Sequence, residues 1–146
     1  MDKRKAITIG LVLIAVGAYF INVEVQSYLG RQVISDLSFT VNPLDEALVQ
    51  AKGQSKMVLA DLSAIWCPSC RKLDKQVFSN VKVSDVIKRD YVFARVEYES
   101  QEGEAFMERY GVTGFPNLVV LDGDGNLIKK LAVTFNADQF LKNLNR

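Results

Sequence analysis

Histidine is absent from this 146-residue sequence, and cysteine occurs only twice, at Cys67 and Cys70. The absence of histidine excludes Ser-His and Cys-His nucleophile pairs and removes the usual nitrogen ligands of zinc and copper. Two thiolates do not complete a four-ligand zinc site, so a metal site would need a second chain or a two-coordinate soft ion such as Cu(I). We therefore expect no metal site, and nothing in the sequence indicates a bound cofactor.

The sequence also lacks an excess of charge, because 18 Lys and Arg residues balance 17 Asp and Glu residues. It has no basic stripe of the kind that nucleic-acid-binding domains carry, so nucleic acid is not an expected partner. Hydrophobic residues make up 49% of the chain, which is enough for a packed core. This content excludes the disordered and collagen-like classes.

The N-terminus carries Lys3, Arg4 and Lys5 before an uncharged run over residues 6–23. As a helix this run would rise about 27 Å, close to the ~30 Å thickness of a hydrocarbon core. We interpret residues 1–25 as an uncleaved membrane anchor. The positive-inside rule then predicts a cytoplasmic N-terminus and a folded part outside the cytoplasm, in the periplasm of a bacterial inner membrane.

Two other interpretations of this segment stay open. A signal peptide cleaved after Ala18 would leave a soluble periplasmic protein, although Tyr19, Phe20 and Ile21 continue the apolar run beyond that point. A buried core helix fits less well, because the run is apolar on all sides.

The rest of the sequence alternates between strand and helix patterns. We expect a spacer over residues 26–37 and a folded domain over residues 38–146. Strands are expected at residues 38–41, 57–64, 91–98, 117–122 and 126–133, and helices at 43–53, 67–78, 81–88, 102–110 and 137–144. Asn42 is the expected N-cap of the first of these helices. The alternation predicts an α/β fold, and the final hairpin adds an antiparallel edge.

Both cysteines lie in the stretch AIWCPSCRK, directly after a predicted buried strand. A C-x-x-C motif in such a pattern is typical of a thioredoxin-like redox site. At a helix N-terminus, unpaired N–H groups and the helix dipole would lower the pKa of Cys67, and Pro68 fits the first turn. We expect Cys67 to attack a disulfide and Cys70, one turn on, to resolve the adduct. A purely structural disulfide is the alternative, but so short a loop adds little stability.

The sequence resembles the thioredoxin superfamily over nearly all of residues 38–146. Three features carry the resemblance: the WCPSC motif, Asp61 six residues before Cys67, and the segment RYGVTGFPNL. In the last segment, Pro116 would be the cis-proline that faces the dithiol in that family. The resemblance implies a thioredoxin-like fold, with a central mixed sheet flanked by helices, here joined to an N-terminal transmembrane helix.

Within the superfamily, the sequence is similar to the C-terminal domain of DsbD-type thiol-disulfide interchange proteins, on Arg71-Lys72 and the VFSN stretch that follows. This likeness implies protein disulfides as substrates and a transmembrane electron donor of the DsbD type as partner. Three features depart from related patterns. Pro68-Ser69 replaces the Gly-Pro of ordinary thioredoxins, and Arg95 stands where a lysine is common. The glutathione-binding signature of glutaredoxins is not evident after Pro116.

Further site residues have expected roles. Burial should raise the pKa of Asp61, which would suit a proton acceptor for Cys70, and Arg95 would oppose that shift if it reaches the carboxylate. The alternative is a core aspartate satisfied by Arg95. Trp66 either shields one side of the dithiol or is a plain core aromatic. A cis bond at Pro116 would leave the backbone of Phe115 open to pair with a bound peptide.

These inferences predict a membrane-anchored disulfide oxidoreductase that reduces protein disulfides. A dithiol oxidase is the alternative within the same class. A binding or chaperone module in exported-protein or cytochrome assembly is the alternative from another class.

Overall fold

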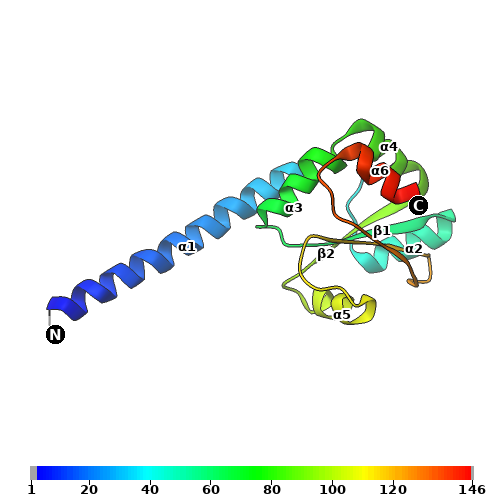
Figure 1. The fold of residues 1–146 in the computed structure, drawn as a ribbon. Coiled ribbons are helices and arrows are strands. Elements are labelled where there is room, and N and C mark those ends of the chain that lie inside the picture. The colour runs from blue at the N-terminus through cyan, green and yellow to red at the C-terminus, as the bar shows by residue number, and fades with distance from the viewer. Residues whose placement is uncertain (1–2, 146) are drawn as a thin grey trace.

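The computed structural model describes residues 3–145, in which one long helix projects from an α/β domain (Figure 1). The helices are α1 (Lys3–Ser35), α2 (Leu44–Gln54), α3 (Pro68–Leu73), the π-helical turn η1 (Asp74–Phe78), α4 (Val81–Asp90), α5 (Gln101–Tyr110) and α6 (Ala137–Asn145). The strands are β1 (Met57–Ser63), β2 (Tyr91–Glu97), β3 (Asn117–Leu121) and β4 (Leu127–Leu131).

The four strands form one mixed sheet in the order β2-β1-β3-β4. Strand β1 pairs in parallel with β2 and antiparallel with β3, and β3 pairs antiparallel with β4. Every residue of β1 after Met57 is buried, which explains why its sequence is a continuous run rather than an alternation. The predicted thioredoxin-like sheet flanked by helices is confirmed.

Helices cover both faces of the sheet. On one face, α3, η1, α4 and α6 enclose a core in which Phe78 lies 5.0 Å from Phe93 and 5.7 Å from Phe140, measured between ring centroids. On the other face, α2 and α5 pack around residues such as Val58 and Phe106. Because α3 follows β1 after only a short turn, its N-terminus lies at one end of the central strand.

Helix α1 differs from the expectation that residues 26–37 form a spacer. The helix continues without a break to Ser35, and its C-terminal part packs against α3 and η1. Residues Ile7–Ser35 are long and apolar enough to cross a membrane, with a mean hydropathy of 1.9 in their most apolar window, none of which is buried. Figure 1 shows the N-terminal part of α1 standing clear of the domain and its C-terminal end lying beside α3.

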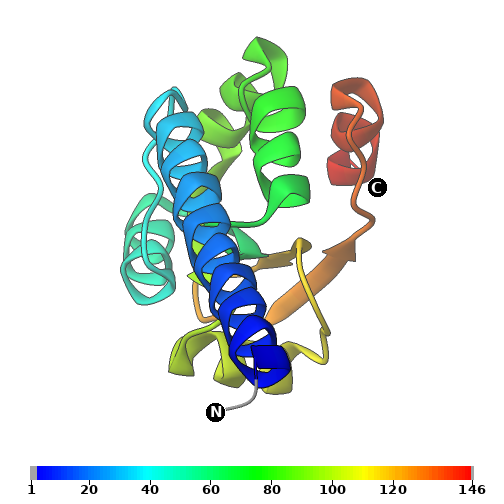
Figure 2. The ribbon, with the colours of Figure 1, turned by 90° about the vertical axis from the view of Figure 1, so that its left-hand side faces the viewer.

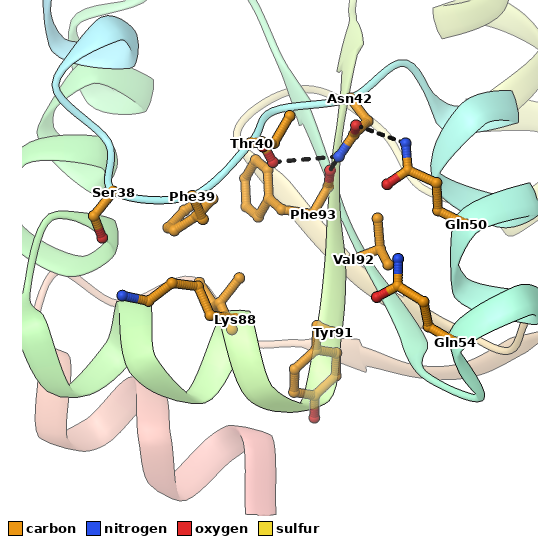
Figure 3. Close-up of a pocket in the computed structure, with 11 residues that line it drawn as sticks. Ser38, Phe39, Thr40, Asn42, Gln50, Gln54, Lys88, Tyr91, Val92 and Phe93 are labelled. Carbon is orange, nitrogen blue, oxygen red and sulfur yellow. Dashed lines mark hydrogen bonds between the residues drawn. The ribbon is translucent and has the colours of Figure 1, made fainter.

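The strand expected at residues 38–41 does not form. The only pairing with β2 here is a bridge between Asn42 and Ala94, because Leu37 and Phe39 turn into the core, where the Phe39 ring lies 5.0 Å from that of Phe93. A pocket of about 310 Å³ lies along the uncovered part of β2, between this segment, α2 and α4 (Figure 3).

The start of α2 also differs from the expectation. Pro43 occupies the N-cap position, and the helix runs past Gly53 to Gln54, after which Ser55 adopts a left-handed conformation. Asn42 does not cap the helix. Its Nδ2 donates to the Phe93 carbonyl at 3.0 Å, and its Oδ1 accepts from Gln50 at 3.1 Å.

Strand β4 forms the other edge of the sheet, and only its last residue, Leu131, is buried. Two adjacent lysines extend from it to neighbouring helices. Lys129 Nζ donates to the carbonyl of Leu144 in α6, and Lys130 Nζ donates to the Gly111 carbonyl at 2.7 Å. Gly111 is the C-cap of α5 and has a φ of 58°, a conformation that glycine adopts readily.

Candidate active site

The two cysteines lie at the start of α3, as predicted. Cys67 is the N-cap residue, Pro68 occupies the first turn, and Cys67 forms a disulfide with Cys70 across a Cα–Cα distance of 5.3 Å. The Cys70 N–H donates to Cys67 Sγ at 3.1 Å, and Ser69 Oγ lies 3.0 Å from the same sulfur. After reduction, these polar groups and the helix N-terminus would favour a thiolate at Cys67.

Three partly exposed aromatic side chains pack against the two cysteines, which are themselves buried. The Trp66 ring meets Phe115 edge to face at 5.5 Å, and Phe115 in turn lies 4.5 Å from Tyr98. Trp66 is also fixed by its indole N–H, which donates to Glu99 Oε2 at 3.0 Å. The Phe115–Pro116 peptide bond is cis, as expected. Trp66 and Phe115 are therefore packed beside the cysteines and keep part of their surface open to solvent.

Asp61 lies on β1, on the sheet face that α3 covers, and is 1% exposed. Arg95, on the neighbouring strand β2, reaches it with Nη2 2.8 Å and Nε 3.1 Å from Oδ2. The same guanidinium extends to Asp74 of η1, with Nη1 3.1 Å from Oδ2 and Nη2 against Oδ1. One largely buried guanidinium thus pairs with two buried carboxylates between the sheet and the helical segment that carries Cys70.

This arrangement sets the protonation behaviour of Asp61. Burial raises its pKa, Arg95 opposes the rise, and the charge of Asp74 adds to it, so that the pKa is raised to about 6. Burial alone would lower the pKa of Arg95, but the two carboxylates raise it, so the guanidinium stays charged. Asp61 Oδ1 is buried and has no hydrogen-bond partner among residues 3–145. The carboxylate therefore keeps one oxygen free to accept a proton.

Two further acidic residues, Glu97 at the end of β2 and Glu99 just beyond it, contact the two residues that precede Cys67. Glu97 Oε2 accepts from the backbone N–H of Ile65 at 3.2 Å, and burial raises the pKa of Glu97. Glu99 holds Trp66. Negative charge near the cysteines disfavours a thiolate and so acts against the helix N-terminus.

The sequence named the two cysteines and a buried Asp61 and left open the contact with Arg95 that the structure shows, but it gave no role to Asp74, Glu97 or Glu99. A signal for Asp74 was present, because it follows Cys70 by four residues and so lies on the same helix face. The signal for Glu97 and Glu99 was the parallel pairing of β1 with β2, which brings the ends of both strands to one edge. Within the described part of the chain, no group of three or more Cys, Asp, Glu or His side chains is placed to hold a metal ion.

Comparison with known proteins identifies the family. Residues 44–146 match the family model described as a thioredoxin-like domain. The chain belongs to the thioredoxin-like family. Among curated relatives of this thioredoxin-like protein, the thiol:disulfide interchange protein DsbD of Cronobacter sakazakii is 38% identical over 96 residues, which are 65% of this chain and 16% of the relative. DsbD of Tatumella citrea is 34% identical over 110 residues, 73% of this chain and 19% of the relative. The chain thus spans less than a fifth of these relatives.

Solved structures agree with the fold of this thioredoxin-like protein. A thioredoxin from Thermus thermophilus superposes with a TM-score of 0.67 at 28% identity, covering 75% of this chain and 86% of that one. The reduced C-terminal domain of Neisseria meningitidis DsbD superposes with a TM-score of 0.59 at 26% identity, covering 70% of this chain and 94% of that one. The resemblance to DsbD-type domains is therefore confirmed at the level of homology.

Proposed function

We propose that this thioredoxin-like protein is a membrane-anchored thiol-disulfide oxidoreductase that reduces protein disulfides outside the cytoplasm. The observation that carries the proposal is the Cys67–Cys70 disulfide at the N-terminus of α3, with Cys67 Sγ accepting from the Cys70 N–H. A thiolate formed at that sulfur has hydrogen-bond donors ready, which is the requirement for attack on a disulfide.

The reaction begins with the reduced dithiol. The Cys67 thiolate attacks one sulfur of a substrate disulfide, the substrate S–S bond breaks, and the second substrate sulfur leaves as a thiolate. Cys70 then gives its proton to Asp61 and attacks Cys67 Sγ, which releases the first substrate sulfur. Two electrons have passed to the substrate, and the Cys67–Cys70 disulfide remains.

A dithiol donor must restore the reduced state by the same exchange in reverse. A transmembrane electron carrier of the DsbD type fits this role, and the homology to interchange proteins supports it. The donor loses two electrons and becomes a disulfide, and the chain regains both thiols.

Substrates would bind over the aromatic side of the site. Phe115 lies just before β3, so its backbone is positioned to pair with an extended peptide as an added strand, while Trp66 borders the same surface. A peptide placed there would pass beside Cys67. The proposal therefore assigns peptide binding to Trp66, Phe115 and Pro116, and electron transfer to the two cysteines with Asp61.

Anchoring through α1 is supported by the length and apolarity of its exposed segment and by the basic residues before it. With such an anchor, the proposal has the N-terminus in the cytoplasm and the domain in the periplasm. A cleaved signal peptide is the alternative, and N-terminal sequencing of the mature protein decides between them. A mature chain that begins at Tyr19 would contradict the anchor and leave the exported location intact.

The function is tested by reduction of insulin disulfides with dithiothreitol as the electron source. The wild-type chain should accelerate the reaction, and the Cys67→Ser variant should not. Equal rates with both proteins would contradict the proposed oxidoreductase activity. A binding or chaperone module predicts instead that a Cys67→Ser, Cys70→Ser double variant keeps its cellular function.

A dithiol oxidase is the second candidate, and the donors to Cys67 Sγ favour it, because a stabilised thiolate makes the oxidised form a stronger oxidant. Asp61, Glu97 and Glu99 favour the reductant, since their charges disfavour that thiolate.

A further inference from the structure

The C-terminal part of α1 lies directly on the turn that leads to the dithiol. Gly30 of α1 is packed against Ile65, two residues before Cys67. A Cβ atom at Gly30 would come within 2.2 Å of the Ile65 carbonyl oxygen and 3.3 Å of its carbonyl carbon. Real Cβ atoms do not approach backbone so closely, so this contact requires glycine. Gly17, in the exposed part of the same helix, has nothing within 4 Å of its Cβ position.

Two further contacts hold the same face of α1 on the domain. Arg71 Nη1, on α3, donates to Gln26 Oε1 at 2.7 Å and to the Gln26 carbonyl at 3.4 Å. Ser27 is 6% exposed, and Leu37, just beyond the helix, belongs to the core. The docked positions Gln26, Ser27 and Gly30 recur at the spacing of one helix face. The contact is therefore a continuous interface and not a flexible tether.

The docking fixes how far the dithiol lies from the end of the apolar segment. The uncharged run ends at Val23, and helix rise places Gln26 about 5 Å and Gly30 about 10 Å beyond it. The headgroup layer on each side of a bilayer is about 5–8 Å thick. The turn from Ile65 to Cys67 therefore lies at the outer boundary of the headgroups. Figure 2, which looks at the molecule from the N-terminal end of α1, shows α3 alongside α1.

We propose that α1 acts as a rigid strut that holds Cys67 at the membrane surface, so that its redox partner is a membrane protein with a dithiol at the level of the headgroups. This inference rests on the proposed function, because it takes α1 as the anchor and the dithiol as the reactive group. One partner thiolate attacks the Cys67–Cys70 disulfide, and Cys70 leaves as a thiolate and takes up a proton. The second partner thiol resolves the adduct, which leaves the partner as a disulfide and this chain as a dithiol.

The first test measures the height of the site in liposomes that contain the full chain. Trp66 is the only tryptophan, it adjoins Cys67, and it is partly exposed, so its fluorescence reports the position of the dithiol. A nitroxide on the lipid headgroup should quench this emission strongly, and bromine deep in the acyl chains should not. Gly30→Leu should lose the quenching, and the matched variant Gly17→Leu, which adds the same side chain to the same helix, should keep it.

A second variant covers the case in which Gly30→Leu fails to fold. A flexible Gly-Ser linker inserted after Val25 leaves every docking contact in place but separates the docked segment from the membrane segment. It should also abolish quenching by the headgroup nitroxide.

The third measurement follows reduction of the Cys67–Cys70 disulfide by two probes, a phospholipid with a thiol headgroup and soluble glutathione. In the wild-type chain and in Gly17→Leu, the disulfide should be reduced faster by the lipid thiol than by glutathione. In the linker variant, reduction by the lipid thiol should be about tenfold slower, because the effective concentration of the lipid thiol at the Cys67–Cys70 disulfide falls with linker length. Its rate with glutathione should not change.

The outcomes separate this inference from the proposed function. A chain that does not float with liposomes contradicts the anchor itself. Two outcomes would contradict the rigid strut without affecting the proposed oxidoreductase activity. One is a chain that floats with liposomes but shows no headgroup quenching, and the other is a linker variant that behaves as wild type in both measurements.

Discussion

The Arg95 guanidinium donates to only one carboxylate oxygen of Asp61, since Nη2 and Nε both lie against Oδ2, at 2.8 and 3.1 Å. Oδ1 has no partner within the described chain. The ion pair is thus incomplete, and Arg95 divides its donors between Asp61 and Asp74. The incomplete pairing explains why burial, rather than the cation, decides the direction in which the pKa of Asp61 moves.

Replacement of Asp61 should stabilise the oxidised protein at high pH. The pKa of Asp61 is raised to about 6 in the folded state, from the ordinary value of 3.8 for an aspartate. Between these values the folded state binds more protons than the unfolded chain, so the free energy of unfolding falls as the pH rises from about 4 to about 6. Asp61→Asn lacks this pH dependence. Its free energy of unfolding relative to wild type should therefore rise by up to about 3 kcal/mol from pH 4 to pH 8. Urea unfolding at both pH values measures it, with the exposed Asp36→Asn as control. A gain that is larger at pH 4 would contradict the assignment.

Replacement of Asp74 should change the pH profile of adduct release. The charge of Asp74 raises the pKa of Asp61 and takes a share of Arg95. In Asp74→Asn, Arg95 serves Asp61 alone, so the pKa of Asp61 should fall below about 6. The rate at which Cys70 releases a mixed disulfide should then level off at a lower pH than in wild type. Stopped-flow measurement of that step gives the profile.

The matching control for this profile is Asp61→Asn, which should abolish the inflection and slow release at pH 7 by about 10²-fold. An inflection that moves to higher pH in Asp74→Asn would mean that Asp74 acts by a purely structural route.

The two cysteines should behave differently when replaced. Cys70→Ser keeps the attacking thiolate and loses the group that releases it, so mixed disulfides with substrate proteins should accumulate. Cys67→Ser should form none, because Cys67 is the N-cap residue whose sulfur accepts from the Cys70 N–H, whereas Cys70 lies one turn inside α3, away from the N-terminal donors that favour a thiolate. Non-reducing gels of both variants give the answer, and adducts on Cys67→Ser alone would reverse the assigned roles.

The reduction potential should be nearer to thioredoxin's about −270 mV than to DsbA's about −120 mV. Strong oxidants stabilise the reduced thiolate, whereas here Glu97 and Glu99 place negative charge beside the site. Equilibration with glutathione buffers measures the potential. A value above about −180 mV would contradict the proposal that the protein acts as a reductase. Glu99→Gln should make the potential less negative, while Glu46→Gln, on the opposite side of the sheet, should leave it unchanged.

Local patterns predicted most of the fold and the reactive pair. The C-x-x-C motif after an apolar strand placed Cys67 at a helix start because Pro68 suits only the first turn. The docked end of α1 was not predicted. Ser27 and Gly30 are small residues with polar residues around them, and such a composition on its own is typical of a spacer. The contact with Ile65 depends on two segments far apart in the chain, and periodicity cannot report such a pairing.

The strand expected at residues 38–41 was wrong for a related reason. Its alternating pattern suits an edge strand, but the core space beside Phe93 takes Phe39 and bends the segment away. Sharing of Arg95 by Asp61 and Asp74 was likewise invisible, because it depends on how η1 lies over two parallel strands.

The anchoring proposed above would give Lys129 and Lys130 on β4 a second effect, because it would confine the protein to the plane of a membrane. Anchored chains diffuse in two dimensions with their domains at a common height, so sheet edges of neighbouring copies meet far more often than they would in free solution. An edge strand that carries adjacent positive charges repels its counterpart on another copy. Since the same two side chains also hold the ends of α5 and α6, the charges that keep copies apart are built into the packing of the fold.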